Sequence, residues 1–328
     1  MPTAKPFSVF FLLLCLPSLA LLPGSALAAN PHSRRSSSFS FFWPWRRSNA
    51  ARSEPSNGYF APADGGGTML TKAPGTFPPA GEPLNIIISG SSDPAVLKDS
   101  QALGGFRNFF LSIGFSGECL GQHSGLPQTA DLGDGNGFVN ETAVLRYNYG
   151  DPALGTCQET IQGGNHFRYW TQNGKSADSG AYFFATSYEK PIAQGHDIIV
   201  NGYNLGRDWL IGNITNTPIN TTALTNTSTF TGTTSYAGFV YTSSIAYVSG
   251  LLPNSSDGVN HAGTVGVNGA NAVDGLVAVV TIAITTKPAN ATSGAAGSGG
   301  RLDPQSIPAL IPTTFLLLSS LLLGALAL

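Results

Sequence analysis

Two long apolar stretches, one near each end, constrain this chain more than any other feature of its sequence. Phe7 to Leu22 is apolar apart from one proline and two serines, and the only polar residues from Ile307 to Leu328 are two threonines and two serines. Such stretches approach the length of about 20 apolar residues that crosses a bilayer. We therefore expect a water-soluble domain to form only from the residues between them.

The first stretch has the layout of a secretory signal. Lys5 supplies the positive charge before the apolar region, and Ala26-Leu27-Ala28 gives the small-x-small pattern at which such signals are cleaved. The alternative is an N-terminal membrane anchor, which the short length and the proline disfavour. We expect residues 1–28 to be a cleaved signal peptide.

The second stretch has the layout of a glycosylphosphatidylinositol (GPI) signal. A run of small residues at 291–298 is followed by a polar spacer and then by the apolar tail, with no basic residue after it. The alternative is an ordinary tail-anchored helix. We expect attachment at Ser293 or at nearby Gly294 or Gly297, a flexible stalk over residues 289–306 and removal of residues 307–328. The protein would then be held by a GPI lipid in the extracellular space, on the outer face of the plasma membrane or in the cell wall.

Glycosylation signals agree with an extracellular location. Six Asn-x-Ser/Thr tripeptides are potential sites for N-linked glycans, and a seventh at Asn216 is excluded by Pro218. We expect most of the six to be modified. They are Asn140, Asn213, Asn220, Asn226, Asn254 and Asn290.

Cysteine usage predicts one disulfide. Cys15 leaves with the signal peptide, and Cys119 and Cys157 remain. Two cysteines in an oxidising compartment are expected to pair. The alternative, a Cys/His catalytic pair, requires one of the two thiols to be free.

Residues 29–81 differ in composition from those that follow. From Asn30 to Gly81 there are six Lys or Arg residues against two acidic ones, a serine run and many Pro and Gly residues. We expect a disordered linker or a propeptide. The aromatic run Phe41 to Trp45 suits contact with a membrane or with cell-wall polysaccharide. Basic residues among aromatics also suit nucleic acid, but a secreted protein seldom meets any, so we expect no nucleic-acid partner.

Residues 82–288 have the composition of one folded domain. Helical and strand patterns are mixed without a βαβ repeat, which favours an α+β fold: a mixed or antiparallel sheet with helices on a face, flanked by disordered segments. Helices are expected after Asp93-Pro94, over 106–113 and around 205–210 with Asn204 as its cap. Strands are expected at 84–88, 166–172, 181–188 after a turn at 179–180, 236–248 and 276–285, and a glycosylated loop at 215–234.

Established catalytic and metal-binding motifs are not found. The nearest approach to a nucleophile elbow, Gly90-Ser91-Ser92-Asp93-Pro94, ends in proline where the motif needs glycine. Residues 132–137 resemble a calcium loop but lack its spacing, so a turn is the better interpretation. We predict no metal site, and the sequence specifies no cofactor.

Two clusters of ionisable residues stand out. Strand alternation places His166 and Arg168 on one face, and the second cluster comprises His196-Asp197 and Arg207-Asp208. Histidine can act as acid, base or ligand, and arginine holds phosphate or carboxylate. These residues form either an acid/base or anion-binding site, in which His166, Arg168, His196 and Asp208 converge, or buried pairs such as Arg168–Asp208 or Arg207–Asp197.

The same strings carry a family resemblance. His166-x-Arg168-x-Trp170, the strand ending at Tyr188-Glu189, Gly-His-Asp-Ile at 195–198 and Arg-Asp-Trp-Leu at 207–210 resemble the LssY carboxy-terminal-like domain. Pro-Leu-Asn at 83–85 and the stretch 273–279 resemble its opening and closing strands. The chain is also similar to secreted fungal proteins with the strings Gly-Asp-Gly-Asn-Gly and Gly-Gly-Asn-His-Phe-Arg. The resemblance covers residues 82–288.

The resemblance implies a domain of unknown function, which in bacterial relatives accompanies phosphatase-like or transport-like membrane modules. Those relatives often carry doubled histidines where this chain has Asn165-His166 and Gly195-His196. A metal site made of two histidine pairs is therefore not expected.

Two functions remain open at this stage, and so does the question whether the protein is an enzyme. The first is a binding or wall-associated surface module. The second is a hydrolase of a phosphate-bearing or ester substrate, with His166 and His196 as acid/base groups and Arg168 and Arg207 holding an anion. Catalysis requires the two histidines to converge in a pocket, whereas a structural role leaves them apart or sealed in the core.

Overall fold

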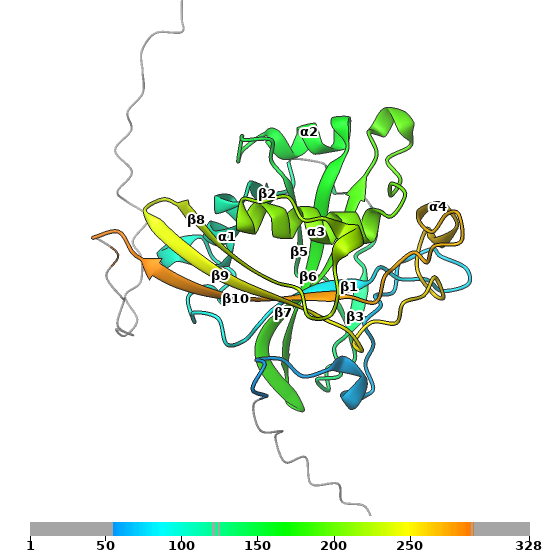
Figure 1. Cartoon of the computed structure of the whole chain (residues 1–328), viewed down its shortest axis with the longest axis horizontal. Helices are drawn as coiled ribbons and strands as arrows, with labels where there is room; N and C mark the ends of the chain where they lie inside the picture. Colours follow the sequence, from blue (N-terminus) through cyan, green and yellow to red (C-terminus); the bar gives the residue numbers. More distant parts are fainter. Residues whose placement is uncertain (1–54, 120–121, 124, 290, 292–328) are drawn as a thin grey trace, which may run out of the picture. The chain divides into compact units, whose positions relative to one another are not determined.

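An eight-stranded mixed sheet organises residues 55–119, 122–123, 125–289 and 291, which are the residues that the computed structural model describes (Figure 1). The strand order is β2-β5-β6-β7-β1-β10-β9-β8. Only β1 and β10 run parallel, and the other neighbouring strands are antiparallel. The α+β class and the mixed sheet are confirmed. The strands are β1 (Leu84–Ile88), β2 (Phe115–Gly117), β5 (Ala143–Tyr147), β6 (Gly164–Gly174), β7 (Ala177–Glu189), β8 (Thr229–Tyr236), β9 (Phe239–Val248) and β10 (Val277–Thr286), with β3 (Thr129–Asp131) and β4 (Phe138–Asn140) in a separate pair.

The sheet separates two apolar clusters, because alternate residues of a strand point to opposite faces. In β6, Phe167 and Tyr169 enter the first cluster and Trp170 enters the second. In β1, Ile86 and Ile87 divide between the clusters in the same way. The expected alternation of β6 is therefore confirmed, and it places His166 and Arg168 on the face of Trp170.

In the described part of the chain, four α-helices accompany the sheet: α1 (Phe106–Ser112), α2 (Gly155–Gln162), α3 (Gly202–Thr215) and α4 (Ala262–Val265). The expected helices at 106–113 and 205–210 are confirmed as α1 and α3. Asn201, not Asn204, precedes α3, and the Asn204 amide donates to Asn201 Oδ1. The segment after Asp93-Pro94 forms only a turn. Three-residue and four-residue 3-10 helices lie at Pro62–Gly65, Ala102–Gly104, Ile192–Gln194 and Thr221–Ala223.

The β6–β7 hairpin turns at residues 175–176 and not at 179–180 as expected. Gly174 pairs with Ala177, and β7 already contains Gly180. The pairing becomes irregular between Thr171 and Asn173, and Gly180 takes φ 66° opposite that point. Its left-handed conformation marks a bulge in the strand, which the sequence pattern does not distinguish from a turn.

Residues 55–81 pack on the domain, so the expected domain boundary at residue 82 lies too late. Tyr59 and Met69 are buried in the second apolar cluster. Leu70 pairs with Pro83 and Lys72 with Thr129 in isolated bridges. High Pro and Gly content indicated a linker, but backbone hydrogen bonds and a few buried side chains hold this segment against the strands.

The expected glycosylated loop at 215–234 is only partly a loop, because its last residues form the edge strand β8. The sequon residues Asn140, Asn220, Asn226 and Asn254 are exposed. Asn213 is half-buried in α3, where its amide donates to the Ile113 carbonyl at 3.2 Å. Asn290 lies outside the described residues.

The predicted signal peptide, the aromatic run Phe41 to Trp45, the predicted GPI attachment residues and the apolar tail also lie outside the described residues. In the part of the chain that the structure describes, no helix combines the length and the apolar character needed to cross a bilayer.

Candidate functional site

A polar cleft opens beside the end of the sheet where β6 begins and β7 ends. Its volume is about 520 Å³. The Cys119–Cys157 disulfide forms part of its wall, which confirms the predicted pairing. Its lining residues are Cys119, Gln122, His123, Arg146, Cys157, Thr160, Arg168, Glu189, Ile192 and His196.

Strand register places the central side chains in a row. Arg146 of β5 is directly opposite His166 of β6, which is opposite Ser187 of β7. Residues opposite one another in a sheet share a face. The Ser187 hydroxyl lies 3.4 Å from His166 Nε2, and His166 is only 1% exposed. The imidazole therefore forms the floor beneath the cleft and is not part of its open wall.

Glu159 reaches the same floor from α2. It is fully buried, and Arg146 donates to its Oε2 at 2.9 Å. Gly164, at the start of β6, makes this approach possible, because a Cβ at that position would lie 2.8 Å from Glu159 Cγ. A side chain there would displace the glutamate from the cleft floor.

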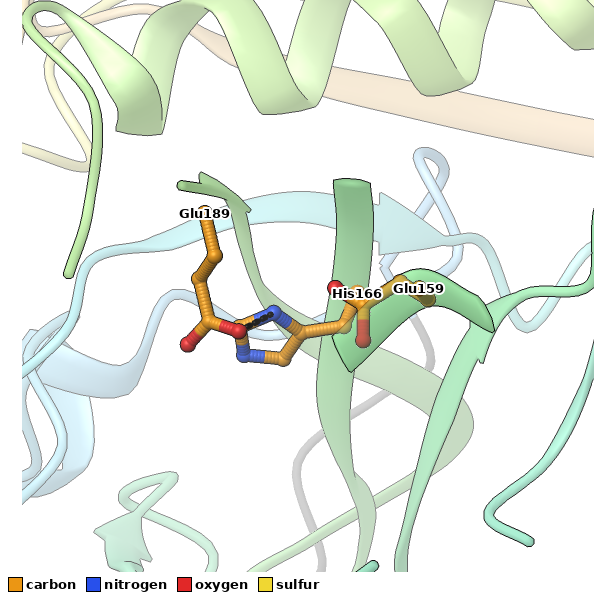
Figure 2. Close-up of side chains that lie close together, drawn as sticks. All are labelled: Glu159, His166 and Glu189. Carbon is orange, nitrogen blue, oxygen red and sulfur yellow. Dashed lines mark ion pairs between the residues drawn. The ribbon is translucent and has the colours of Figure 1, made fainter. Parts of the chain in front are cut away.

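Glu189 joins the floor to the open cleft. One carboxylate oxygen, Oε2, lies 3.4 Å from His166 Nδ1, 3.4 Å from an Arg146 nitrogen and 2.9 Å from His196 Nε2. Figure 2 shows the His166 ring directed toward this carboxylate. His196, 25% exposed, is the outermost of these groups, and its left-handed φ of 50° follows Gly195. We call Glu159, His166 and Glu189 the cleft centre.

An outer set of ion pairs surrounds the cleft centre. Arg168 donates to both oxygens of Glu141 at 3.2 Å and lies 3.7 Å from Glu82. Arg146 also pairs with Glu118 at 3.0 Å, and His123 lies 2.8 Å from Glu118. Both guanidinium groups are thus neutralised by carboxylates within the protein.

Burial and charge shift the pKa values of the cleft centre in different directions. Burial raises the pKa of Glu159 to about 7, although the charge of Arg146 opposes it. Burial lowers the pKa of His166 to about 3, so this imidazole is neutral near pH 7. Burial alone would raise the pKa of Glu189, but its contacts with His166, His196 and Arg146 outweigh it and lower that pKa to about 2. The hydrogen bond to Glu189 raises the pKa of His196.

Several buried polar atoms at this site have no hydrogen-bond partner within the protein. Glu159 Oε1 and His166 Nδ1 belong to the cleft centre, and Glu82 Oε2 and Arg168 Nε face each other beside it. Most buried polar atoms in folded proteins are hydrogen-bonded. At this site, therefore, the described residues leave several buried polar atoms without the hydrogen bonds that such atoms usually make.

The six candidate residues from the sequence divide between three places. His166 and His196 converge on Glu189, and Arg168 lines the same cleft. Asp197 does not join them and pairs with His261 at 2.7 Å. The expected convergence of four residues is correct for the three in the cleft and wrong for Asp208.

Arg207 and Asp208 form a separate buried network. The Arg207 guanidinium pairs with Asp208 and with Asp274, each at 2.7 Å, and the Tyr247 hydroxyl donates to Asp208. The expected pairs Arg168–Asp208 and Arg207–Asp197 are therefore wrong. Asp274 takes the place of Asp197 because the loop before β10 runs past α3.

The residues that sequence reasoning missed are mostly acidic: Glu82, Glu118, Glu141, Glu159 and Glu189, together with Arg146 and His123. Only Glu189 belongs to one of the strings that carry the family resemblance. Glutamates are common on solvated surfaces, and nothing in their spacing indicates burial. Strand register and the position of α2 bring them together.

The charged groups of the cleft are already paired with one another, which disfavours an anionic ligand. The guanidinium groups of Arg146 and Arg168 pair with the carboxylates of Glu118, Glu141 and Glu189, and Glu189 also holds His196. An anion entering the cleft would have to displace carboxylates that already hold both arginines. A cation would instead meet carboxylate oxygens and imidazole nitrogens.

Comparison of the chain with protein-family models, with curated proteins and with solved structures gives no match.

Proposed function

We propose that the protein is a GPI-anchored extracellular glycoprotein whose folded domain binds a ligand in the cleft around Glu189. The observation that supports binding at this place is the convergence of His166, His196 and Arg146 on the Glu189 carboxylate, beside a cleft of about 520 Å³. The terminal sequence signals support the anchor, and the four exposed sequon residues agree with a glycosylated surface. Cell-wall polysaccharide is one candidate ligand.

A second candidate is hydrolysis of an ester or phosphate-bearing substrate. A carboxyl group with a pKa near 7, as Glu159 has, suits general acid catalysis, and His196 is within reach of the cleft. The anion-holding role assigned to Arg168 and Arg207 has less support. Arg168 is held by Glu141, and Arg207 belongs to the other network. Ligand binding is therefore the function that we favour.

A thermal-shift screen of the purified full chain against metal ions, sugars and phosphate esters tests the cleft. We expect at least one ligand to raise the melting temperature of the wild type but not that of His196→Ala. The matched control is His261→Ala, which removes another partly exposed, carboxylate-paired histidine outside the cleft. Shifts that are equal in the two variants, or no shift with any compound, would contradict the proposal.

Treatment of intact cells with a phosphatidylinositol-specific phospholipase tests the anchor. We expect the protein to be released into the medium without the peptide 307–328. Retention of the protein after a validated digestion, with that peptide still attached, would show an ordinary membrane helix instead.

A further inference from the structure

We propose that the cleft centre, Glu159, His166 and Glu189, binds one divalent transition-metal ion, with His196 as a fourth ligand. This inference deepens the proposed function, because it names a metal cation as a ligand of the same cleft. It does not depend on the membrane anchor.

The geometry of the cleft centre suits a small ion. One potential ligand atom from each of Glu159, His166 and Glu189 lies within 4.8 Å of the other two. Zinc bonds to nitrogen and oxygen of about 2.0–2.2 Å in a tetrahedral site imply ligand atoms about 3.3–3.6 Å apart. His166 Nδ1 and Glu189 Oε2 are 3.4 Å apart. This pair can therefore bind a common ion without a large movement of either side chain.

The bonding of the surrounding atoms leaves one side-chain atom of each buried residue without a hydrogen bond. Arg146 holds Glu159 through Oε2, and the other oxygen, Oε1, is buried without a partner. Ser187 faces Nε2 of His166, and the other ring nitrogen, Nδ1, makes no hydrogen bond with the described residues and lies 3.4 Å from Glu189 Oε2. Metal ligands are usually oriented in this way, with one atom bonded to the protein and the other to the ion. The two unpartnered atoms are the independent observation that separates this site from an ordinary acidic cluster.

His196 contacts the cleft centre from the solvent side through Glu189, and its ring would have to move inward to become the fourth ligand. Its Nε2 lies 2.9 Å from Glu189 Oε2, and its ring lines the cleft. An ion reaching the cleft centre from solvent would exchange the His196–Glu189 hydrogen bond for two metal bonds. The fully buried Glu159 and His166 would keep their positions.

The donor set indicates the class of metal. Imidazole nitrogen suits zinc and neighbouring transition metals, whereas calcium and magnesium prefer oxygen donors alone. Two carboxylates with two histidines therefore favour a transition metal over calcium. Zinc is the appropriate probe because it accepts a tetrahedral set of nitrogen and oxygen ligands.

Metal analysis of the purified, tag-free full chain tests the inference. The protein, with its disulfide intact, is stripped with a chelator and dialysed against Zn²⁺, with Ca²⁺ in a parallel sample. We expect one Zn²⁺ per chain, no stoichiometric Ca²⁺, and a higher melting temperature with Zn²⁺. Glu159→Gln and His166→Leu should each weaken Zn²⁺ binding by more than tenfold.

The surface variant His196→Ala keeps the test decisive if a variant of a buried residue fails to fold. It should also weaken Zn²⁺ binding by at least tenfold, whereas the matched variant His261→Ala should not change it. Undiminished Zn²⁺ binding in His196→Ala and in the folded buried variants, or stoichiometric Ca²⁺ in place of Zn²⁺, would overturn the inference. If a sugar or phosphate ester binds in a His196-dependent way and Zn²⁺ does not, the metal site is wrong and the proposed cleft function stands.

Discussion

Two buried polar clusters of this domain, the Arg207 network and the cleft centre, differ in how completely their atoms are hydrogen-bonded. All five N–H groups of Arg207 donate: to Asp208, to Asp274 and to the Leu276 carbonyl, at 2.7–3.0 Å. In the cleft centre, by contrast, Glu159 Oε1 and His166 Nδ1 are buried without a partner.

The difference separates a structural role from a ligand-binding one. A buried network in which every polar atom is hydrogen-bonded makes a fold more rigid. A buried polar group without a hydrogen bond lowers the free energy of unfolding. A domain selected for stability alone should contain few buried polar groups without hydrogen bonds. The Arg207 network therefore serves stability, and the cleft centre gives up stability in exchange for free ligand atoms.

Removal of Arg207 should have the largest effect on stability. Arg207→Leu leaves Asp208 and Asp274 without their cation, and breaking a buried ion pair costs about 3–5 kcal/mol. Urea unfolding monitored by tryptophan fluorescence measures this loss. The control is Arg107→Leu, because the partly exposed Arg107–Asp99 pair should contribute about 1 kcal/mol or less. If both variants lost the same free energy of unfolding, the buried Arg207 network would contribute no more to stability than the partly exposed Arg107–Asp99 pair.

Loss of the disulfide should come next and should act on the cleft. Cys119 and Cys157 are 38 residues apart, and a loop of this size is worth roughly 4 kcal/mol in the chain-entropy model, with measured values of about 2–4 kcal/mol. Cys157 lies on α2 with Glu159. In the double variant Cys119→Ser/Cys157→Ser we expect faster hydrogen exchange in α2 than in α3, which carries Arg207. Equal acceleration in both helices would show that the two regions are not independent.

Removal of the His166 imidazole should cost little. His166→Leu replaces a buried ring that has two long contacts, one to Ser187 and one to Glu189, each of 3.4 Å. Replacing a poorly satisfied buried polar group with an apolar one of similar volume is often neutral or stabilising. We expect a change within about 1 kcal/mol of the wild type in metal-free buffer. A loss as large as that of Arg207→Leu would make the cleft centre a structural network as well.

The smallest expected effect is a change in pH dependence at Glu82. Burial raises the pKa of this carboxyl above its ordinary value, although the charge of Arg168 and a hydrogen bond from Gln128 oppose the shift. The folded protein keeps this proton at pH values where the unfolded chain has released it. The free energy of unfolding should therefore fall as pH rises above the unfolded pKa of about 4.5.

Glu82→Gln should make the free energy of unfolding less dependent on pH over that interval. Urea unfolding at several values between about pH 5 and pH 8 measures the slope for both proteins. Identical slopes would show that Glu82 is not the group responsible.

Local patterns predicted the helices and strands better than they predicted the contacts between them. The alternation of β6 correctly placed His166 and Arg168 on one face, because a strand repeats every two residues whatever its neighbours are. Sequence alone could not show that Arg146 lies beside His166, because this depends on the register of β5. Nor could it show that α2 folds Glu159 back over Gly164.

The candidate site was predicted in part for the same reason. Histidines and arginines attract notice because they supply acid/base and anion-binding chemistry, and three of the six candidates lie in the cleft. Glutamates attract little notice, although Glu159 and Glu189 supply the cleft centre. The bulge at Gly180 and the packed segment 55–81 show that glycine and proline mark breaks in local structure without showing whether the chain there is buried.

The parallel pairing of β1 with β10 has a consequence for the order in which the chain can fold during its synthesis. Ile88 pairs with Val280, and the Asp93 amide donates to the Ile282 carbonyl. During synthesis β1 leaves the ribosome long before β10 has been made. One edge of this buried strand therefore stays unpaired until nearly the whole domain has been synthesised. Contacts so distant in sequence slow folding. Completion of the central sheet therefore has to wait for β10, and a product that stops before Val277 lacks the strand that closes it.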